Sequence, residues 1–164
     1  MAANWKKIDK SIFTPLLIAA VVLLPIVYLI ATGLLHQNNY RTFLYALSDA
    51  TVYCSQNDSL RVSQEEGDAR VTEENAYALY FLFTKKQAKP RNAVPEEAPQ
   101  LVLDYGSGAL LECWTHKMEE GARRTYGILW RFTDPEGTTW IFDTDDLSMS
   151  LLKRRSKPEY NQPW

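Results

Sequence analysis

The segment RTYGILWRFTDPEGTTWIFDT, residues 124–144, contains two runs in which apolar and polar residues alternate, separated by an Asp-Pro-Glu-Gly turn. Alternation of this kind on both sides of a turn predicts a β-hairpin. Two registers are open to it: a type I turn at residues 135–136 followed by Gly137 as a left-handed bulge, or a plain four-residue loop. The choice matters because a shift of one residue moves every side chain of a strand to the other face.

In the bulged register all the large aromatic residues of the hairpin lie on one face, together with Ile128. Phe132 is then opposite Trp140, and Trp130 is opposite Phe142. The plain loop would divide these aromatic residues between two faces. We therefore predict the bulged register, with an apolar face that another element must cover.

The segment from Thr72 to Lys86 is expected to cover that face as a helix. Acidic residues stand in its first turn and basic residues in its last, which matches the helix dipole. Between them AYALYFLF, residues 76–83, is apolar on nearly every face, as is typical of a helix buried under a sheet. A strand is the alternative, because Tyr and Phe favour sheets, but the length and the end signals favour a helix.

Further strands are expected on both sides of this helix. LVLDYGSGALLECWTHK, residues 101–117, predicts two strands that meet at 106–108, and SLRVSQEEGDARV, residues 59–71, predicts a hairpin around a turn at 65–68. Residues 87–100 contain three prolines and are expected to form a surface loop. After the last strand, Asp145 or Asp146 is the expected cap of a short helix.

Together these elements predict an α+β fold, in which a helix packs on an antiparallel β-meander with an added N-terminal hairpin. We assign residues 54–152 to this domain, which is too short to be divided in two. Residues 153–164 are assigned to a basic C-terminal tail.

The run SIFTPLLIAAVVLLPIVYLIATGLL, residues 11–35, contains no Asp, Glu, Lys, Arg or His. At ~1.5 Å per residue a helix of this length covers roughly 37 Å, enough for a bilayer core of about 30 Å. The run predicts a single transmembrane helix after a basic tail, residues 1–10. The alternative is a secretory signal cleaved after Gly33, but the run is longer than the ~7–15 apolar residues of a usual signal.

The charges on the two sides of this run predict its orientation. Lys6, Lys7 and Lys10 precede it, whereas Arg41 is the sole Lys or Arg among residues 36–50. The positive-inside rule then places the N-terminus in the cytoplasm and the C-terminal domain outside it, at the cell membrane.

Residues 36–53 carry apolar side chains at helical spacing and predict an amphipathic membrane-proximal helix. This helix either continues from the membrane segment or begins anew after Gly33. Its apolar stripe is expected to pack on the domain; the alternative is that it lies on the membrane or against a partner.

Cys54 and Cys113 are the two cysteines of the chain. Outside the cytoplasm an even pair can form a disulfide, and the alternative is two small buried apolar side chains. His116 follows Cys113 by three positions on a predicted strand, so the two side chains point to opposite faces. Neither a Cys/His nucleophile nor a zinc site is therefore expected.

Two clusters of charged residues are candidates for ligand contacts. A weak calcium site is suggested by three carboxylates that stand close together without the glycine and distal glutamate of an EF-hand loop, namely Asp143, Asp145 and Asp146. Contact with anionic lipid, an anionic envelope polymer or an acidic partner is suggested by Lys153, Arg154, Arg155 and Lys157. Helix capping and a solvated helix end are the simpler explanations of the two clusters.

The composition and the absence of motifs bound the function. Apart from Lys6, Lys7, Lys10 and Asp9, the chain has 15 basic and 19 acidic residues, which disfavours nucleic-acid binding. No catalytic motif or cofactor site is recognised, so an enzyme is not expected. The layout resembles, in architecture alone, accessory subunits of envelope-spanning assemblies such as secretion or conjugation channels.

We therefore expect a membrane-anchored extracytoplasmic binding or scaffolding protein, an accessory subunit that contacts the bilayer and a protein partner in a membrane or envelope complex. A ligand-binding sensory domain, with a pocket between helix and sheet, is the second hypothesis. An envelope enzyme is the third. A deep polar pocket would favour the second or third hypothesis, whereas a closed core with exposed apolar patches would favour the first.

Overall fold

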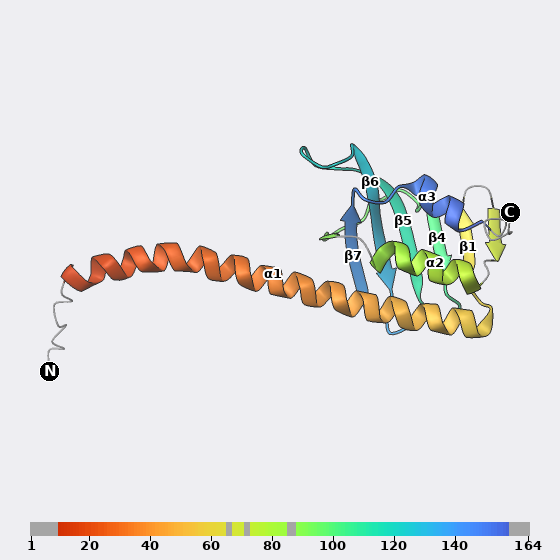
Figure 1. Ribbon diagram of the computed structural model, residues 1–164, viewed down its shortest axis with the longest axis horizontal. Coiled ribbons are helices and arrows are strands. Elements are labelled where there is room, and N and C mark those ends of the chain that lie inside the picture. Colours follow the sequence, from red (N-terminus) through yellow and green to blue (C-terminus); the bar gives the residue numbers. More distant parts are fainter. Residues whose placement is uncertain (1–9, 65–66, 71–72, 85–87, 158–164) are drawn as a thin grey trace. The chain divides into compact units, whose positions relative to one another are not determined.

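The computed structural model describes residues 10–64, 67–70, 73–84 and 88–157. It divides into two compact units, Met1–Asn39 and Tyr40–Trp164. Helix α1 (Lys10–Asn57) begins in the first unit and ends in the second, which also contains every other described element (Figure 1). The predicted tail before Lys10, the cap at Thr72 and the lysines at 85 and 86 lie outside the described residues.

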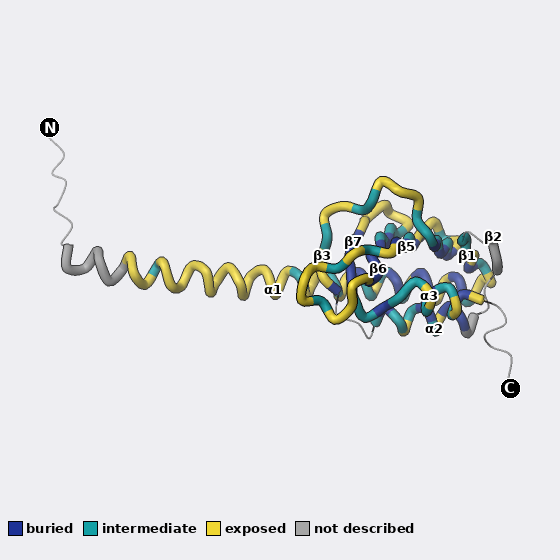
Figure 2. Tube along the Cα trace, turned by 90° about the horizontal axis from the view of Figure 1, so that it is seen from above, coloured by how far each residue is buried: buried dark blue, intermediate teal, exposed yellow. Residues whose placement is uncertain are grey.

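The first unit presents apolar side chains to its surroundings. Side chains from Leu17 to Leu35 are exposed with few exceptions (Figure 2), and the most apolar window of α1 has a mean hydropathy of 2.6 with no residue buried. Among the described residues, α1 is the helix that is long and apolar enough to cross a membrane. It passes through Gly33 without a new start.

In the second unit, residues 40–57 of α1 carry the predicted apolar stripe, and this stripe packs on the domain. Phe43, Leu47, Ala50 and Cys54 are buried. The expectation that the stripe covers the domain is confirmed. The helix ends where Asp58 adopts a left-handed conformation (φ 48°), so that the Ser59 N–H donates to the Cys54 carbonyl at 3.1 Å.

The other elements form one antiparallel sheet and two further helices. The strands are β1 (Arg61–Gln64), β2 (Gly67–Arg70), β3 (Lys89–Pro90), β4 (Leu101–Asp104), β5 (Leu110–Lys117), β6 (Tyr126–Thr133) and β7 (Thr139–Thr144), and the helices are α2 (Glu73–Thr84) and α3 (Met149–Arg155). The strands pair in the order β2-β1-β4-β5-β6-β7-β3, so the meander β4 to β7 is flanked by the predicted N-terminal hairpin. The α+β fold is confirmed.

The hairpin of β6 and β7 has the bulged register. Phe132 pairs with Trp140 and Trp130 with Phe142. The Asp134 N–H donates to the Thr138 carbonyl at 3.0 Å, and Gly137 has φ 85°. The prediction is confirmed, and the aromatic side chains share the face that the helices cover.

Three predicted boundaries are wrong. Residues 87–100 are not all loop, because β3 pairs with β7. The turn of the first hairpin is shorter than predicted, since Gly67 already pairs with Gln64. The cap of α3 is Ser148, whose side chain accepts from the Leu151 N–H, and not Asp145 or Asp146. Those two carboxylates bind Arg123 in the β5–β6 loop instead.

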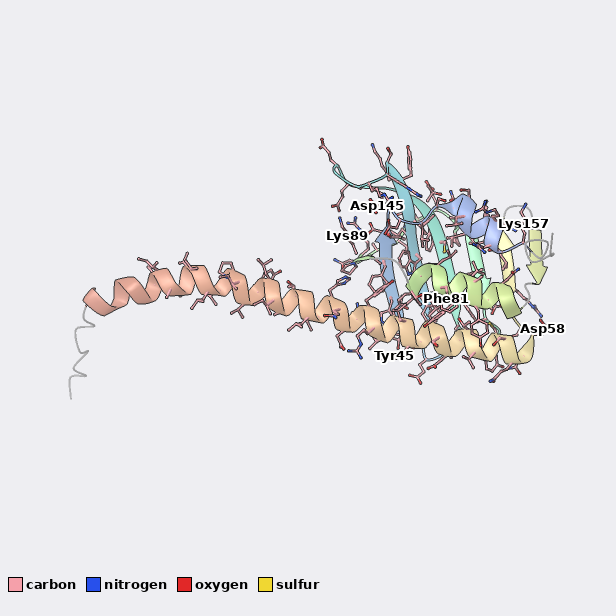
Figure 3. All side chains as sticks on the ribbon, viewed as in Figure 1. Tyr45, Asp58, Phe81, Lys89, Asp145 and Lys157 are labelled. Atoms are coloured by element: carbon pink, nitrogen blue, oxygen red, sulfur yellow. The ribbon has the colours of Figure 1, made fainter. Side chains whose placement is uncertain are left out.

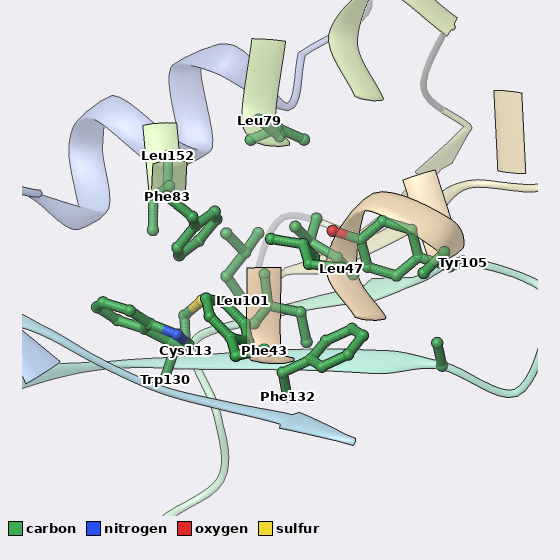
Figure 4. Packing of buried hydrophobic residues seen from close by; sticks show 14 of the residues in the cluster. Phe43, Leu47, Leu79, Phe83, Leu101, Tyr105, Cys113, Trp130, Phe132 and Leu152 are labelled. Carbon is green, nitrogen blue, oxygen red and sulfur yellow. The ribbon is translucent and has the colours of Figure 1, made fainter. Parts of the chain in front are cut away.

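The core is centred on the ring of Phe43 from α1, which lies between three aromatic rings of the sheet. Its centroid is 6.3 Å from that of Trp130, 5.8 Å from that of Phe132 and 5.3 Å from that of Phe142. The ring centroid of Phe83 of α2 lies 5.2 Å from that of Trp130 (Figure 4). Helix α2 covers this face as predicted, and the stripe of α1, predicted to pack on the domain, shares the cover with it.

Helix α2 is also less buried than its composition predicts. Leu79 and Phe83 point into the core, but Tyr77 and Phe81 are exposed. The reason is that α1 occupies part of the apolar face of the sheet, so α2 packs through one side and leaves the other side open.

Replacing Phe43 by alanine should lower the free energy of unfolding of the domain by about 3–5 kcal/mol, because it removes a buried ring from three aromatic contacts. Urea denaturation of the full chain in nanodiscs, followed by tryptophan fluorescence, measures the change. Tyr45→Ala is the matched control, because Tyr45 lies on the same helix with its side chain exposed; it should change stability by no more than about 0.5 kcal/mol. Equal losses for the two variants would show that Phe43 is not the centre of the core.

Candidate functional site

The two cysteines do not form a disulfide. Cys54 and Cys113 are both free and buried. Cys113 shares the inward face of β5 with Leu111, and its thiol lies in the apolar core (Figure 4). Burial raises the pKa of the Cys54 thiol to about 11 and raises that of Cys113 further. The disulfide hypothesis is therefore wrong for this structure, and both residues serve as small apolar side chains of the core.

The three aspartates of the calcium candidate are not brought together. The described residues contain no group of three or more His, Cys, Asp or Glu side chains that could hold a metal ion. Asp143 is buried and pairs with Arg91, whereas Asp145 and Asp146 bind Arg123. The cluster divides because successive residues at the end of a strand point in different directions.

The basic candidates lie at the end of α3. Lys153, Arg154 and Arg155 occupy its last turn, where positive charge suits the helix dipole. Arg154 and Lys157 are exposed, and the buried Asn75 of α2 donates to the Lys157 carbonyl at 3.1 Å. These contacts join the end of α3 to α2. Binding of an anionic partner by the basic residues stays a prediction.

A charged cluster that the sequence did not reveal lies on the sheet face opposite the helices. Arg91, just after β3, donates from Nε to Asp143 Oδ2 of β7 at 2.6 Å. Its Nη2 lies 2.9 Å from Glu119 Oε1, and His116 Nε2 of β5 lies 3.9 Å from Asp143 Oδ2. Four residues from distant parts of the sequence therefore meet at one end of the sheet.

The electrostatics of this cluster are set by Asp143, whose side chain is 0% exposed. Its hydrogen bond raises the pKa of Arg91, and the hydrogen bond from Arg91 lowers the pKa of Glu119. A lowered carboxyl pKa means that this pair adds stability above the ordinary pKa of Glu119 and loses it as the pH falls through the lowered value. Asp143 Oδ1 is buried and has no hydrogen-bond partner within the described part of the chain.

Residues 91–100 cross the same outer face of the sheet. The Trp114 indole N–H donates to the Glu97 carbonyl at 2.9 Å. Beside them Arg131 binds Glu112 through two nitrogens, at 2.5 and 2.8 Å. The outer face thus combines ion pairs with the buried apolar side chains of Trp114 and Leu129 under a proline-containing strap.

The opposite side of the domain carries exposed apolar side chains. Helices α1 and α2 lie side by side, joined by a bond of 2.5 Å from the Tyr40 hydroxyl to the Phe83 carbonyl and by a 3.3 Å contact between the hydroxyls of Ser55 and Tyr77. Four exposed apolar side chains of these helices, which we call the helix-layer surface, are Tyr45 and Val52 of α1 and Tyr77 and Phe81 of α2. Figure 3 labels Tyr45 and Phe81.

Two open hollows are lined by described residues. One, of about 350 Å³, lies between Asp49 and Tyr53 of α1 and the turn at 134–136. The other, of about 470 Å³, lies beyond the end of α1 beside Ser59 and Gly106. Both are open to solvent.

The described residues define an α+β domain joined to a helix that is able to cross a membrane. Comparison of the chain with protein-family models, with curated proteins and with solved structures found no match.

Both thiols should resist modification in the folded protein, because they are buried and protonated at neutral pH. We expect Ellman's reagent to release no chromophore at pH 7 from the full chain in nanodiscs, and two equivalents after denaturation without a reductant. A single band of unchanged mobility on gels with and without reductant is the second expected result. Loss of free thiol in the denatured sample would instead indicate a disulfide.

Proposed function

We propose that this chain is a membrane-anchored binding or scaffolding protein that acts as an accessory subunit of a membrane or envelope complex. Its domain would bind a partner protein through the helix-layer surface. The single observation that carries this proposal is the exposure of large apolar side chains on one side of a domain whose core is already closed.

The exposure on the helix layer is large for a folded domain. Tyr45 is 62% exposed and Phe81 is 52% exposed, although buried positions for aromatic rings exist on the same two helices. Exposed apolar patches on folded domains mark protein or membrane contacts. Aromatic residues in particular dominate the binding energy at protein interfaces.

The alternative, a ligand pocket between helix and sheet, finds less support. The space it would need is filled by buried side chains, including Phe43, Leu47, Leu79 and Phe83 (Figure 4). Opening a pocket there would require removal of the contacts that hold the helices on the sheet.

Site-specific crosslinking can test the proposed surface. A photoreactive phenylalanine analogue placed at Tyr45 or at Phe81 in the full chain, expressed in its own membrane, should form a discrete adduct with one neighbouring protein. The matched control is Tyr126 at the start of β6, which is 59% exposed and lies outside the helix-layer surface.

Adducts that form from Tyr45 and Phe81 but not from Tyr126 would support the proposal. Phe81→Glu, which changes an exposed position, should abolish the adduct formed from Tyr45 while leaving the unfolding midpoint unchanged. Equal yields at the three positions, or no adduct at any, would contradict the proposal.

We also propose that the N-terminus lies in the cytoplasm and the domain outside it, at the cell membrane. The support is the charge asymmetry of Lys6, Lys7 and Lys10 before the apolar segment against Arg41 after it. Protease added to intact cells or spheroplasts should digest the domain and leave an epitope tag at the N-terminus intact. A domain that is digested only after the membrane is permeabilised would reverse this orientation.

A further inference from the structure

We propose that the side of β7 that faces away from β6 is a docking site for an extended segment of a partner protein that carries an arginine, and that β3 is an intramolecular occupant of this site. The inference rests on the proposed function in taking the domain as a protein-binding module. It concerns a different surface, since β7 and the outer face of the sheet lie away from the helix-layer surface.

The pairing of β3 with β7 is minimal. Lys89 pairs with Asp143 and Pro90 with Phe142, while β7 has six residues (Figure 1). One more backbone bond follows, from the Arg91 N–H to the Ile141 carbonyl at 2.9 Å. Pro90 has no N–H to give to the ladder, and both residues of β3 are exposed. Such a short strand contributes little pairing energy, so a longer segment could replace it.

Arg91 holds β3 beside β7 through its ion pair with Asp143, and the buried Asp143 carboxylate needs a positive charge beside it. The Asp143 carboxylate is fully buried, and a buried charge that loses its partner strongly destabilises the folded state. Any strand that replaces β3 must therefore bring its own cation to the position of the Arg91 guanidinium. Glu119, 2.9 Å from Arg91, adds a second carboxylate for the same cation.

Arg91 hydrogen-bonds only one of the two oxygens of the Asp143 carboxylate. Arg91 reaches Asp143 through Nε and Oδ2, at 2.6 Å, while the buried Oδ1 has no hydrogen-bond partner among the described residues. By contrast, Arg131 binds both oxygens of Glu112 on the same face of the sheet. A partner arginine that approached along a longer strand could bind both Asp143 oxygens in this way, which is the stronger arrangement.

These features match recognition by strand addition, in which main-chain bonds to a sheet edge supply affinity and side-chain sites supply specificity. The main-chain bonds would extend along β7 beyond Asp143 and Phe142. The side-chain site would be the pair Asp143 and Glu119. The structure thus assigns the partner a chemical pattern: an extended segment with arginine at the position that Arg91 now fills.

A synthetic peptide with the sequence of residues 88–100, AKPRNAVPEEAPQ, is the probe for this site. We expect it to bind the full-length Arg91→Gln protein in nanodiscs at least about tenfold more tightly than the wild-type protein, whose own β3 competes at a high effective concentration. Fluorescence anisotropy of the labelled peptide measures the affinity. Hydrogen exchange at Thr139, whose N–H points to the β3 side of β7, should slow when the peptide binds, which places it on β7.

Two matched controls test the role of the arginine. A peptide with glutamine in place of its arginine should lose the gain in affinity. The Arg131→Gln protein, which breaks the ion pair with Glu112 on the same face and leaves the Asp143 carboxylate with its Arg91 partner, should bind the peptide no better than the wild type. Lys89→Gln should also behave as wild type, because the Lys89 contact with Glu119 is exposed and 4.0 Å long.

Equal affinity of the arginine and glutamine peptides for the Arg91→Gln protein would overturn the inference. So would the absence of binding at millimolar peptide, or slowed exchange elsewhere with none at β7. The crosslinks from Tyr45 and Phe81 do not depend on these residues. A negative peptide-binding result would therefore leave the proposed helix-layer surface standing, and a negative crosslinking result would leave the proposed site on β7 standing.

Discussion

The packing of Phe43 against Trp130, Phe132 and Phe142 is the contact on which the rest of the domain depends. The bulged turn at Gly137 puts the aromatic residues of β6 and β7 on one face, and that face must be covered to be stable in water. Residues 40–57 of α1 and α2 share the cover. Residues 40–57, which follow the apolar run at residues 11–35, are therefore part of the core and not a linker.

Because α1 and α2 share the aromatic face of the sheet, some apolar side chains of the helices are buried and others are exposed. Because α1 takes up much of the aromatic face, α2 packs through one side and exposes Tyr77 and Phe81 on the other. The helix side of the domain thus carries apolar groups in excess of what the core needs. The outer face of the sheet carries ion pairs beside the buried Trp114 and Leu129, and there the charge of Asp143 is balanced by Arg91. The two sides offer different chemistry to partners, exposed aromatic side chains on one and ion pairs on the other.

The parts of this fold that follow from local patterns could be predicted from the sequence. The hairpin register followed from turn chemistry and the alternation of Trp130, Phe132, Trp140 and Phe142, and the burial of the stripe at Phe43 and Leu47 followed from helical spacing. Strand β3 could not be predicted, because two residues containing a proline have no periodicity. Nor could the pairing of Arg91 with Asp143, since the partners are 52 positions apart in sequence and no short motif links them. The choice between a disulfide and two buried thiols could not be made from the sequence, because the spacing of Cys54 and Cys113 does not show whether their sulfurs meet.

Residues 40–57 of α1 should form one cooperative unit with the sheet. Native-state hydrogen exchange on the full chain in nanodiscs measures this through the opening free energies of amides in the two elements. In one cooperative unit, the amides of Leu47 and Thr51 in α1 and those of Trp130 and Phe132 in β6 exchange with the same free energy, equal to that of global unfolding. Exchange of the α1 amides at a much lower free energy, while β6 stays protected, would show that the helix is an attachment to an independently stable sheet.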